Sequence, residues 1–293
     1  MKKPLTVLNR RNMIKKTGAV LLATPFFSLT ACDLEDTSTD SSSSSSSSSS
    51  CSDSTTVDAS VDWASGSTDL ITADYPEDSI FECSSTCSVS LTESTTEGPC
   101  YLGVNSEIED ISDDRTGLPM MLCLQLIDED CNPLEGYLIE VWHCDNEGIY
   151  SGDESQSDDT SSFAGDFCTD NDTDAESSIW FRGEQTTDSS GRVNFKSCFP
   201  GWYSGRTIHI HLRVRLAFGG SDYVVSQLCF DDSFSYEICT THELYKDRGE
   251  QDTTLASGDD TVFPASGYDE YMLNIEQNSD GTLLAYKRII ISA

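Results

Sequence analysis

The sequence predicts an all-β protein, a β-sandwich with long loops, over residues 91–293. Apolar and β-branched residues concentrate in short runs at 120–128, 137–145 and 206–218, and such runs are typical of strands. The stretch EDCNPLEG between the first two runs is rich in turn residues. No long segment shows the apolar spacing of a helix. Six or more short strands joined by turns therefore favour a sandwich.

Four further strands are expected along the chain. SIWFRG and VNFKSCF are joined by the turn TDSSGR, DYVVSQLCF follows the 206–218 run, and TLLAYKRIIIS closes the sequence. Residues 151–178 are acidic and rich in glycine and serine. Such a composition indicates a surface insertion rather than a strand.

The first 31 residues have the features of an export signal rather than of a folded segment. The paired arginines in NRRNMIKKTG and the apolar run AVLLATPFFSLTA resemble a twin-arginine signal. A membrane-spanning helix needs about 20 apolar residues, whereas this run is shorter and Pro25 interrupts it. The segment ends in LTAC, which resembles the lipobox of bacterial lipoproteins and makes Cys32 the expected lipidation site. The alternative is an ordinary cleaved signal followed by an incidental cysteine.

We therefore expect an exported lipoprotein that faces the periplasm or the cell exterior and touches the membrane only through a lipid anchor at Cys32. Residues 32–60 are rich in serine, aspartate and threonine, with an unbroken serine run at 41–50. They cannot bury enough apolar surface to fold, which predicts a flexible tether. A lead-in segment at 61–90 and the sandwich at 91–293 follow.

The charge of the chain limits its partners. It carries 17 lysines and arginines against 51 aspartates and glutamates, a formal net charge of -34 at pH 7. Such a surface repels nucleic acid and anionic lipid. The composition therefore excludes nucleic-acid partners and favours solubility.

The chain has 12 cysteines and no CxxC pair, which disfavours a zinc ribbon or a thioredoxin-type centre. An exported chain this rich in cysteine favours disulfides. Cys32 is the expected lipidation site and Cys51 lies in the tether. The other ten cysteines could form up to five bridges, whose pairing the sequence does not define.

The stretch GWYSGRTIHIH at 201–211 holds two of the four histidines in the chain. Strand alternation places His209, His211, Arg213 and Arg215 on one face. Two explanations fit this face: a half-buried strand with a solvated polar side, or a chelating pair of imidazoles. Arg213 and Arg215, further along the strand, are expected to face water.

Four segments occur in a characteristic order: TEGPCYL at 96–102, PLEGYLIEVWHCDNEGIYSG at 133–152, FRGEQTTDSSGRVNFKSCFPGWYSGRTIHIH at 181–211 and VSQLCF at 225–230. Together they resemble the intradiol ring-cleavage dioxygenases, specifically a short, exported, single-domain branch related to the protocatechuate and catechol dioxygenases. The resemblance covers about residues 91–293. It implies the prealbumin-like sandwich core of that family.

The resemblance also implies one non-haem Fe(III) per chain, held by two tyrosines and two histidines. Matched residue by residue, the ligands are Tyr150, Tyr203, His209 and His211. Phenolate and imidazole are suitable iron ligands, and two anionic phenolates favour the ferric state. The segment between Tyr203 and His209 is shorter than in the protocatechuate and catechol enzymes, which affects the expected shape of the pocket.

Further roles follow from the same resemblance. Tyr203 would leave the metal and accept a substrate proton. Arg206 would stabilise negative charge on the substrate ring, and Gln227 would hold the site by hydrogen bonding. His143 and His242 match no ligand of the family and are interpreted as structural or surface residues. The residues expected to line the substrate pocket are Gly98, Pro99 and Tyr101.

The implied reaction cleaves a catechol-type ortho-diphenol between its two hydroxylated carbons. Both atoms of O2 enter the product, a cis,cis-muconate-type diacid, so the implied partners are a small catechol and O2. One alternative is a non-catalytic, prealbumin-like binding module exported as a lipoprotein. Another is a family member that binds iron but turns over poorly.

Overall fold

The structure is a computed structural model of the 293-residue chain. The expected export signal, Cys32, most of the tether and nearly all of the 151–178 insertion lie outside the residues that it describes. None of the helices within those residues has the length and apolar character needed to span a membrane. The described residues are 55–57, 61–81, 90–98, 100–152 and 177–293.

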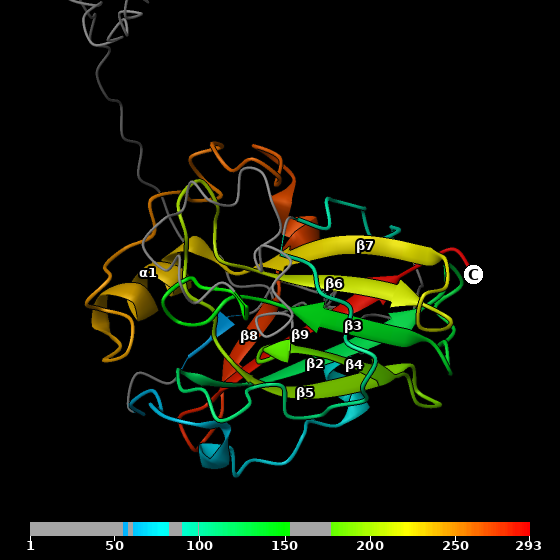
Figure 1. The fold of residues 1–293 in the computed structure, drawn as a ribbon, viewed down its shortest axis with the longest axis horizontal. Helices are drawn as coiled ribbons and strands as arrows, with labels where there is room; N and C mark the ends of the chain where they lie inside the picture. Colours follow the sequence, from blue (N-terminus) through cyan, green and yellow to red (C-terminus); the bar gives the residue numbers. More distant parts are fainter. Residues whose placement is uncertain (1–54, 58–60, 82–89, 99, 153–176) are drawn as a thin grey trace, which may run out of the picture. The chain divides into compact units, whose positions relative to one another are not determined.

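Two β-sheets form the body of the protein (Figure 1). In the first sheet, the strand order is β1-β8-β9-β2-β5, and in the second it is β4-β3-β6-β7. Neighbouring strands are antiparallel except for the parallel pairs β1–β8 and β2–β9. The prediction of an all-β sandwich is therefore confirmed. The strands are β1 (Thr55–Thr56), β2 (Pro119–Ile127), β3 (Leu138–Trp142), β4 (Arg182–Thr186), β5 (Arg192–Cys198), β6 (His209–Arg215), β7 (Asp222–Cys229), β8 (Asn274–Gln277) and β9 (Leu283–Ile290).

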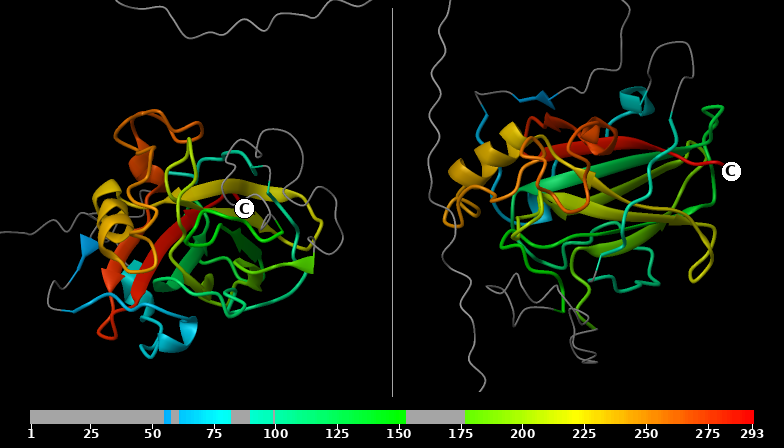
Figure 2. Two further views of the ribbon diagram at one scale, coloured as in Figure 1. Left: turned by 60° about the vertical axis from the view of Figure 1, so that its left-hand side comes forward. Right: turned by 90° about the horizontal axis from the view of Figure 1, so that it is seen from above.

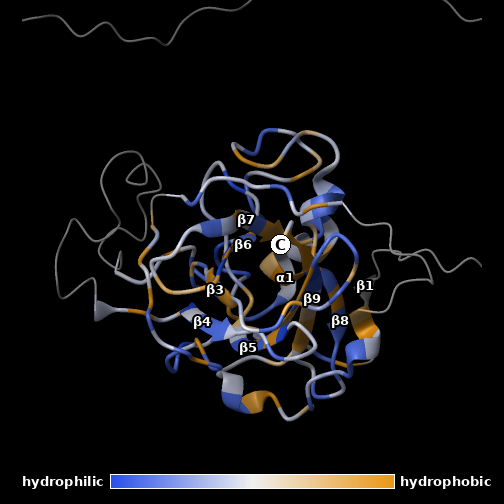
Figure 3. Cartoon of the chain, turned by 90° about the vertical axis from the view of Figure 1, so that its right-hand side faces the viewer, coloured by the Kyte–Doolittle hydropathy of each residue, from blue (hydrophilic) through white to orange (hydrophobic). Residues whose placement is uncertain are grey.

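Alternate residues of the strands fill the space between the sheets. β2 contributes Leu122 and Leu124, and β6 contributes Ile210 and Leu212, all fully buried in one apolar cluster. Figure 3 shows hydrophobic stretches recurring along the strands. Because successive side chains of a strand point to opposite faces, the same alternation turns the polar residues of β6 to the outer face of the second sheet.

The lead-in segment covers the outer face of the first sheet. Ile71 and Phe81 pack against Met121, Cys123 and Tyr286, which point away from the central core. Burial of this apolar surface by residues 61–81 stabilises both the sheet and the segment. The lead-in therefore belongs to the folded unit.

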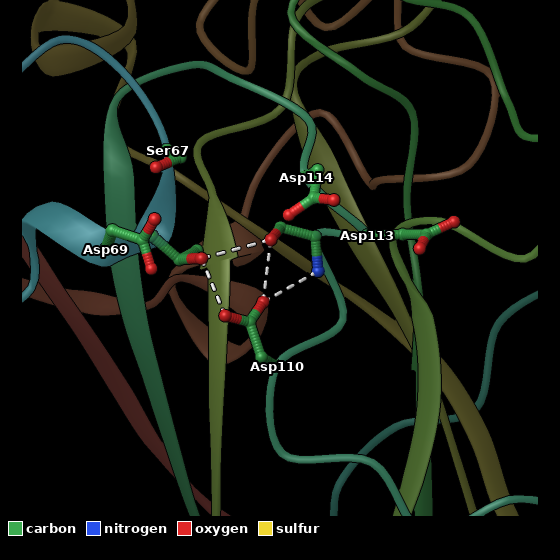
Figure 4. Close-up of a pocket in the computed structure, with 7 residues that line it drawn as sticks. Ser67, Asp69, Asp110, Asp113 and Asp114 are labelled. Carbon is green, nitrogen blue, oxygen red and sulfur yellow. Dashed lines mark hydrogen bonds between the residues drawn. The ribbon is translucent and has the colours of Figure 1, made fainter.

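An acidic pocket of about 270 Å³ marks the contact between the lead-in and the body of the protein (Figure 4). Thr68 Oγ1 donates to Asp110 Oδ2 at 2.6 Å, and Ser112 Oγ donates to Asp110 Oδ1 at 2.7 Å. The carboxylate of Asp110 thus ties the two segments together. Asp69, Asp113 and Asp114 also line the pocket.

One helix, α1 (Asp232–Thr241), follows β7. The side chain of Asp231 caps it by accepting hydrogen bonds from the backbone N–H groups of Ser233 and Phe234, and Ile238 packs into the core. The strand pattern did not predict this helix, because ten residues are too few to show a clear helical spacing. Figures 1 and 2 place α1 at one end of the sandwich and the C-terminus at the other. Among the described residues, three short 3₁₀ helices lie at Thr68–Leu70, Asp78–Phe81 and Tyr268–Tyr271.

The cysteines require a correction. Cys100 and Cys131 each take part in a disulfide, but five of the ten cysteines considered above are buried free thiols, so five bridges cannot form. These thiols pack as small apolar groups in the interior. Cys83, Cys87 and Cys168 lie outside the described residues. The free thiols are Cys123, Cys144, Cys198, Cys229 and Cys239.

Candidate metal centre

The outer face of the second sheet carries polar side chains that are nevertheless buried. The register places Trp142 of β3 beside His211 of β6 on one side and Gln227 of β7 beside it on the other. A strap of chain, residues 93–98 and 100–108, crosses this face. The backbone N–H of Val104 in the strap donates to Glu140 Oε1 of β3 at 3.2 Å. The strap excludes solvent from a face that the sequence pattern left open.

Arg213 and Arg215 were expected to face water, but both are buried, with exposed fractions of 7% and 3%. Arg213 pairs with Glu97 of the strap. Arg215 Nη2 lies 3.1 Å from Glu140 Oε2 and 2.7 Å from Glu184 Oε2. The expectation was wrong because the acidic partners come from other strands and from the strap, and only these partners make burial of the guanidinium groups tolerable.

Four polar atoms meet at the end of this face where β6 begins. Tyr150 Oη lies 3.0 Å from His211 Nε2, and Tyr203 Oη lies 3.0 Å from His209 Nε2. The two Nε2 atoms are 3.2 Å apart and the two phenol oxygens 3.5 Å apart. All four side chains are at most 8% exposed. The structure thus brings together the four residues that the resemblance assigns as iron ligands.

A tight turn after β3 positions Tyr150. Asp145 Oδ1 accepts hydrogen bonds from the backbone N–H groups of Glu147 and Ile149, each at 2.9 Å. The carbonyl oxygen of Asp145 accepts from Gly201 N at 2.7 Å, which joins this turn to the loop that carries the second tyrosine. The two tyrosine loops therefore depend on each other.

Asp145 gives this turn a pH dependence. Burial raises the pKa of Asp145 to about 6, although hydrogen bonds from Ile149 and Glu147 partly oppose the shift. The folded protein therefore takes up a proton as the pH falls through 6, whereas an unfolded aspartate does so only at about pH 4. Protonation of Asp145 hence adds stability as the pH falls from about 6 to about 4, and this contribution is lost as the pH rises again.

We expect Asp145→Asn to remove this pH dependence while keeping a side-chain oxygen that can accept both hydrogen bonds. The wild type should gain about 2 kcal/mol in free energy of unfolding relative to the variant between pH 7 and pH 4. Denaturant titrations of the metal-free proteins at several pH values measure this difference. A difference that stays constant across that range would contradict the assignment.

Burial keeps the four donors neutral in the absence of a cation. It lowers the pKa values of His209 and His211 well below the usual range, and the charge of Arg206 lowers both further. It raises the pKa of Tyr203 to about 12 and that of Tyr150 well above its usual range. Neutral imidazoles offer a lone pair to a metal, and a bound cation replaces the protons of such phenols.

The protonation of His209 is fixed by its surroundings. His209 Nδ1 lies 2.6 Å from the carbonyl oxygen of Thr207, so Nδ1 carries the proton. Its Nε2 lone pair is then directed to Tyr203 and His211. This is the tautomer that a metal ligand requires, with a second hydrogen bond that holds the ring.

The predicted arginine and glutamine lie beside the four donors. Arg206 Nη1 is 3.4 Å from His209 Nε2, and Arg206 Nη2 donates to Gln227 Oε1 at 2.5 Å. Gln227 Nε2 in turn donates to the carbonyl oxygen of Thr96 in the strap at 2.8 Å. Asp260 balances the charge of the guanidinium, with its Oδ2 at 3.2 Å from Arg206 Nε. Asp260 lies in a long loop outside the quoted motifs, so no sequence pattern predicted its contact with Arg206.

The residues expected to line the substrate pocket occupy different places. Gly98 lies against His211, since a Cβ atom built on it would be 3.0 Å from the Cε1 atom of that ring. Tyr101 donates to Glu140 Oε2 at 3.0 Å, and its ring contacts Trp142 with a centroid distance of 5.0 Å. Tyr101 is thus tied to the ion pairs of β6. Pro99 lies outside the described residues.

Arg182 of β4 lies beside the site, and the sequence analysis did not predict it. Its Nε donates to Ser151 Oγ at 2.5 Å, and its guanidinium carbon lies 5.8 Å from the centroid of the Tyr150 ring. Burial lowers the pKa of Arg182 to about 10. The arginine follows directly after Phe181 in the motif FRGEQ, which was the available signal.

His143 and His242 have structural contacts, and both are buried rather than on the surface. His143 Nε2 is hydrogen-bonded to Ser197 Oγ at 2.7 Å. His242 Nε2 donates to the carbonyl oxygen of Ala64 at 3.0 Å, and its Nδ1 accepts from Leu244 N at 3.2 Å. These bonds occupy both histidines in holding chain segments together.

The donor set fits a ferric ion. Over the part of the chain that the structure describes, no group of three or more histidines, cysteines, aspartates or glutamates is placed to bind a metal. The candidate centre instead combines two phenol oxygens with two imidazole nitrogens close enough to bind one ion together. Hard anionic oxygen donors with imidazole suit Fe(III).

The fold and the site define a β-sandwich protein with a buried centre of two tyrosines and two histidines. A family model described as Dioxygenase matches residues 97–240. An intradiol ring-cleavage dioxygenase from Tetranychus urticae is 27% identical, with a TM-score of 0.57 over 70% of this chain and 95% of that chain. The family match and the fold confirm the resemblance to the intradiol ring-cleavage dioxygenases that the motifs predict.

Other solved structures show weaker similarity. A hydroxyquinol 1,2-dioxygenase from Pseudomonas putida DLL-E4 is 18% identical, with a TM-score of 0.47 over 70% of this chain and 68% of that chain. The dioxygenase domain of a carbohydrate-binding fusion from Streptomyces sp. SirexAA-E is 19% identical, with a TM-score of 0.43 over 70% of this chain and 99% of that chain. No curated protein matches the chain.

Proposed function

We propose that this protein is a non-haem Fe(III) dioxygenase that cleaves a catechol-type ortho-diphenol between its hydroxylated carbons to give a cis,cis-muconate-type diacid. The observation that carries the proposal is the convergence of Tyr150, Tyr203, His209 and His211 on one point beside Arg206. A binding module without catalysis has no need for two phenols and two imidazoles buried around that point. The family match and the similarity to the Tetranychus urticae dioxygenase support the same class of reaction.

Tyr150, Tyr203, His209 and His211 would hold one Fe(III). The ion would supply a Lewis-acid template on which the diol and O2 react. Two phenolates offset most of its charge, which makes the ion tolerable in a buried site.

The protein residues divide the remaining work. Tyr203 is less buried than Tyr150, 8% against 1% exposed, which supports Tyr203 as the phenol that substrate reaches and that accepts a hydroxyl proton. Arg206 presents its charge next to His209, where it stabilises negative charge on the substrate ring. Gln227 and Asp260 hold that guanidinium in place from opposite sides.

Iron content and colour test the proposed centre. The purified full-length protein, reconstituted with iron, should hold about one iron per chain and be wine-red to purple, because phenolate-to-Fe(III) charge transfer absorbs visible light. The band should shift when catechol is added without oxygen, and Tyr203→Phe should remove part of it. A colourless, iron-free protein would support the alternative of a non-catalytic binding module. A coloured protein that consumes no O2 with any catechol would indicate a poorly active family member.

We also propose that the protein is exported and anchored through a lipid on Cys32. The motifs RRNMIKK and LTAC support this localisation. Cys32→Ser should move the protein from the membrane fraction to the soluble fraction of the cells that export it. An unchanged distribution would rule out the anchor.

A further inference from the structure

The two histidines of the candidate centre are held in different ways. His209 donates from Nδ1 to the carbonyl oxygen of Thr207 at 2.6 Å. His211 Nδ1 is buried and has no hydrogen-bond partner among the described residues. Metal-binding histidines almost always donate their second ring N–H to an acceptor, which orients the ring. No hydrogen bond at Nδ1 therefore orients the His211 ring, and packing against its faces is left to do so.

The ring of His211 is stacked on the indole of Trp142. The centroids are 4.8 Å apart and the planes are inclined by 11°. The pairing of β3 with β6 places the two residues opposite each other, so the stack is built into the sheet. Gly98 of the strap lies beside the imidazole, since a Cβ atom built on it would be 3.0 Å from Cε1.

Trp142 is itself fixed by packing. Its Nε1 is buried without a hydrogen-bond partner among the described residues, and its exposed fraction is 1%. The ring of Tyr101 meets it edge-on at 5.0 Å, while the guanidinium of Arg213 lies 4.1 Å from the Tyr101 ring centroid. A column of Arg213, Tyr101, Trp142 and His211 therefore runs along the outer face of the sheet.

We propose that Trp142 is a positioning residue for His211: stacking on the indole, in place of a hydrogen bond to Nδ1, holds the imidazole with Nε2 toward the other three donors. The inference rests on the proposed iron centre and extends it. Tyr101, whose ring meets the indole edge-on, supports this stack. The stack supplies orientation without the increase in ligand basicity that a hydrogen bond to Nδ1 gives His209.

Aromatic and aliphatic substitutions at Trp142 test the proposal. Trp142→Phe keeps a flat ring opposite His211, whereas Trp142→Leu and Trp142→Met fill the site without one. In full-length protein, we expect the dissociation constant for Fe(III), measured by competition with a chelator, to rise at least about tenfold in the Leu and Met variants. The Phe variant should stay within about threefold of the wild type, with the charge-transfer band near its original position.

Phe263→Leu is the matched control, because the ring of Phe263 neighbours the other histidine, with its centroid 6.3 Å from that of His209. His209 has its hydrogen bond to Thr207, so this variant should bind iron as the wild type does. Equal losses in Trp142→Phe and Trp142→Leu, or an equal loss in Phe263→Leu, would overturn the stacking role. So would iron binding that none of the Trp142 variants changes.

A metal-free measurement separates failure of this inference from failure of the proposed function. In ¹⁵N-labelled apoprotein, the ring signals of His211 should be sharp in the wild type and in Trp142→Phe and broadened or averaged in Trp142→Leu and Trp142→Met. Unchanged ring signals in the Leu and Met variants would overturn the inference even if iron binds. Wild-type protein that shows the expected ring signals but takes up no iron would overturn the proposed centre alone.

Discussion

Replacing His209 with alanine should reduce the iron content of the protein to background and remove its visible colour. His209 Nε2 lies within 3.5 Å of three groups of the site: Tyr203 Oη, His211 Nε2 and Arg206 Nη1. Its Nδ1–H donates to the carbonyl oxygen of Thr207, so the Nε2 lone pair needed for a metal is already directed inward. Alanine removes that metal ligand and one hydrogen-bond partner of the buried Tyr203 phenol, and losing this bond costs about 1–3 kcal/mol in stability.

His242→Ala is the matched control for this substitution. It also removes a buried imidazole with two hydrogen bonds, in this case to Ala64 and Leu244. We expect a comparable loss of stability and an unchanged iron content. Iron analysis together with the visible spectrum distinguishes the two variants. Full iron occupancy in His209→Ala would remove the histidine from the proposed ligand set.

Replacing Gly148 with alanine should strongly destabilise the loops that carry Tyr150 and Tyr203, although it adds only one methyl group. A Cβ atom at this position would lie 2.1 Å from the carbonyl oxygen of Trp202, and the φ angle of Gly148 is +82°. The clash is with backbone, so the loop that carries Tyr203 has to move. We expect a loss of about 4 kcal/mol in free energy of unfolding, combining the cost of a left-handed alanine with that of overpacking.

Gly205→Ala separates these two causes. Gly205 has the same φ angle of +82°, but a Cβ atom there would meet nothing within 4 Å. This variant should lose only about 1–2 kcal/mol, the cost of a left-handed alanine, and should still bind iron. Denaturant unfolding and iron content provide the comparison. Equal losses in the two variants would show that the close approach of the two loops contributes nothing.

The strands were predictable because burial in a sandwich leaves a period of two in the sequence. Each expected run, from 120–128 to the closing TLLAYKRIIIS, overlaps an observed strand, although β4 begins only at Arg182, near the end of SIWFRG. The helix α1 was not predicted, because its short length hides a helical period and its stability depends on the cap at Asp231 and on packing into the core.

The members of the candidate site that stand in the quoted motifs were predictable from sequence, and the surroundings of those residues were not. Tyr150, Tyr203, His209 and His211 stand in short ordered segments, and the structure brings them together. The burial of Arg213 and Arg215 could not be read from their own strand, since it depends on Glu97, Glu140 and Glu184 from other segments.

Residues that position other residues of the site were not predictable from the sequence pattern. Asp260 reaches Arg206 across 54 positions of sequence, and only the fold joins them. Trp142 stands inside a quoted motif, but its contact with His211 follows from strand pairing. Spatial neighbours of this kind become visible only in the structure.

The incorporation of oxygen tests the central claim most directly. The iron-loaded protein should consume O2 when given a catechol, and with ¹⁸O2 both labelled atoms should appear in a ring-opened diacid, because intradiol cleavage places one oxygen on each new carboxyl group. The His209→Ala variant should form no such product under the same conditions. Iron-loaded wild-type protein that yields only a quinone, or a product that carries no label from O2, would contradict the proposed reaction.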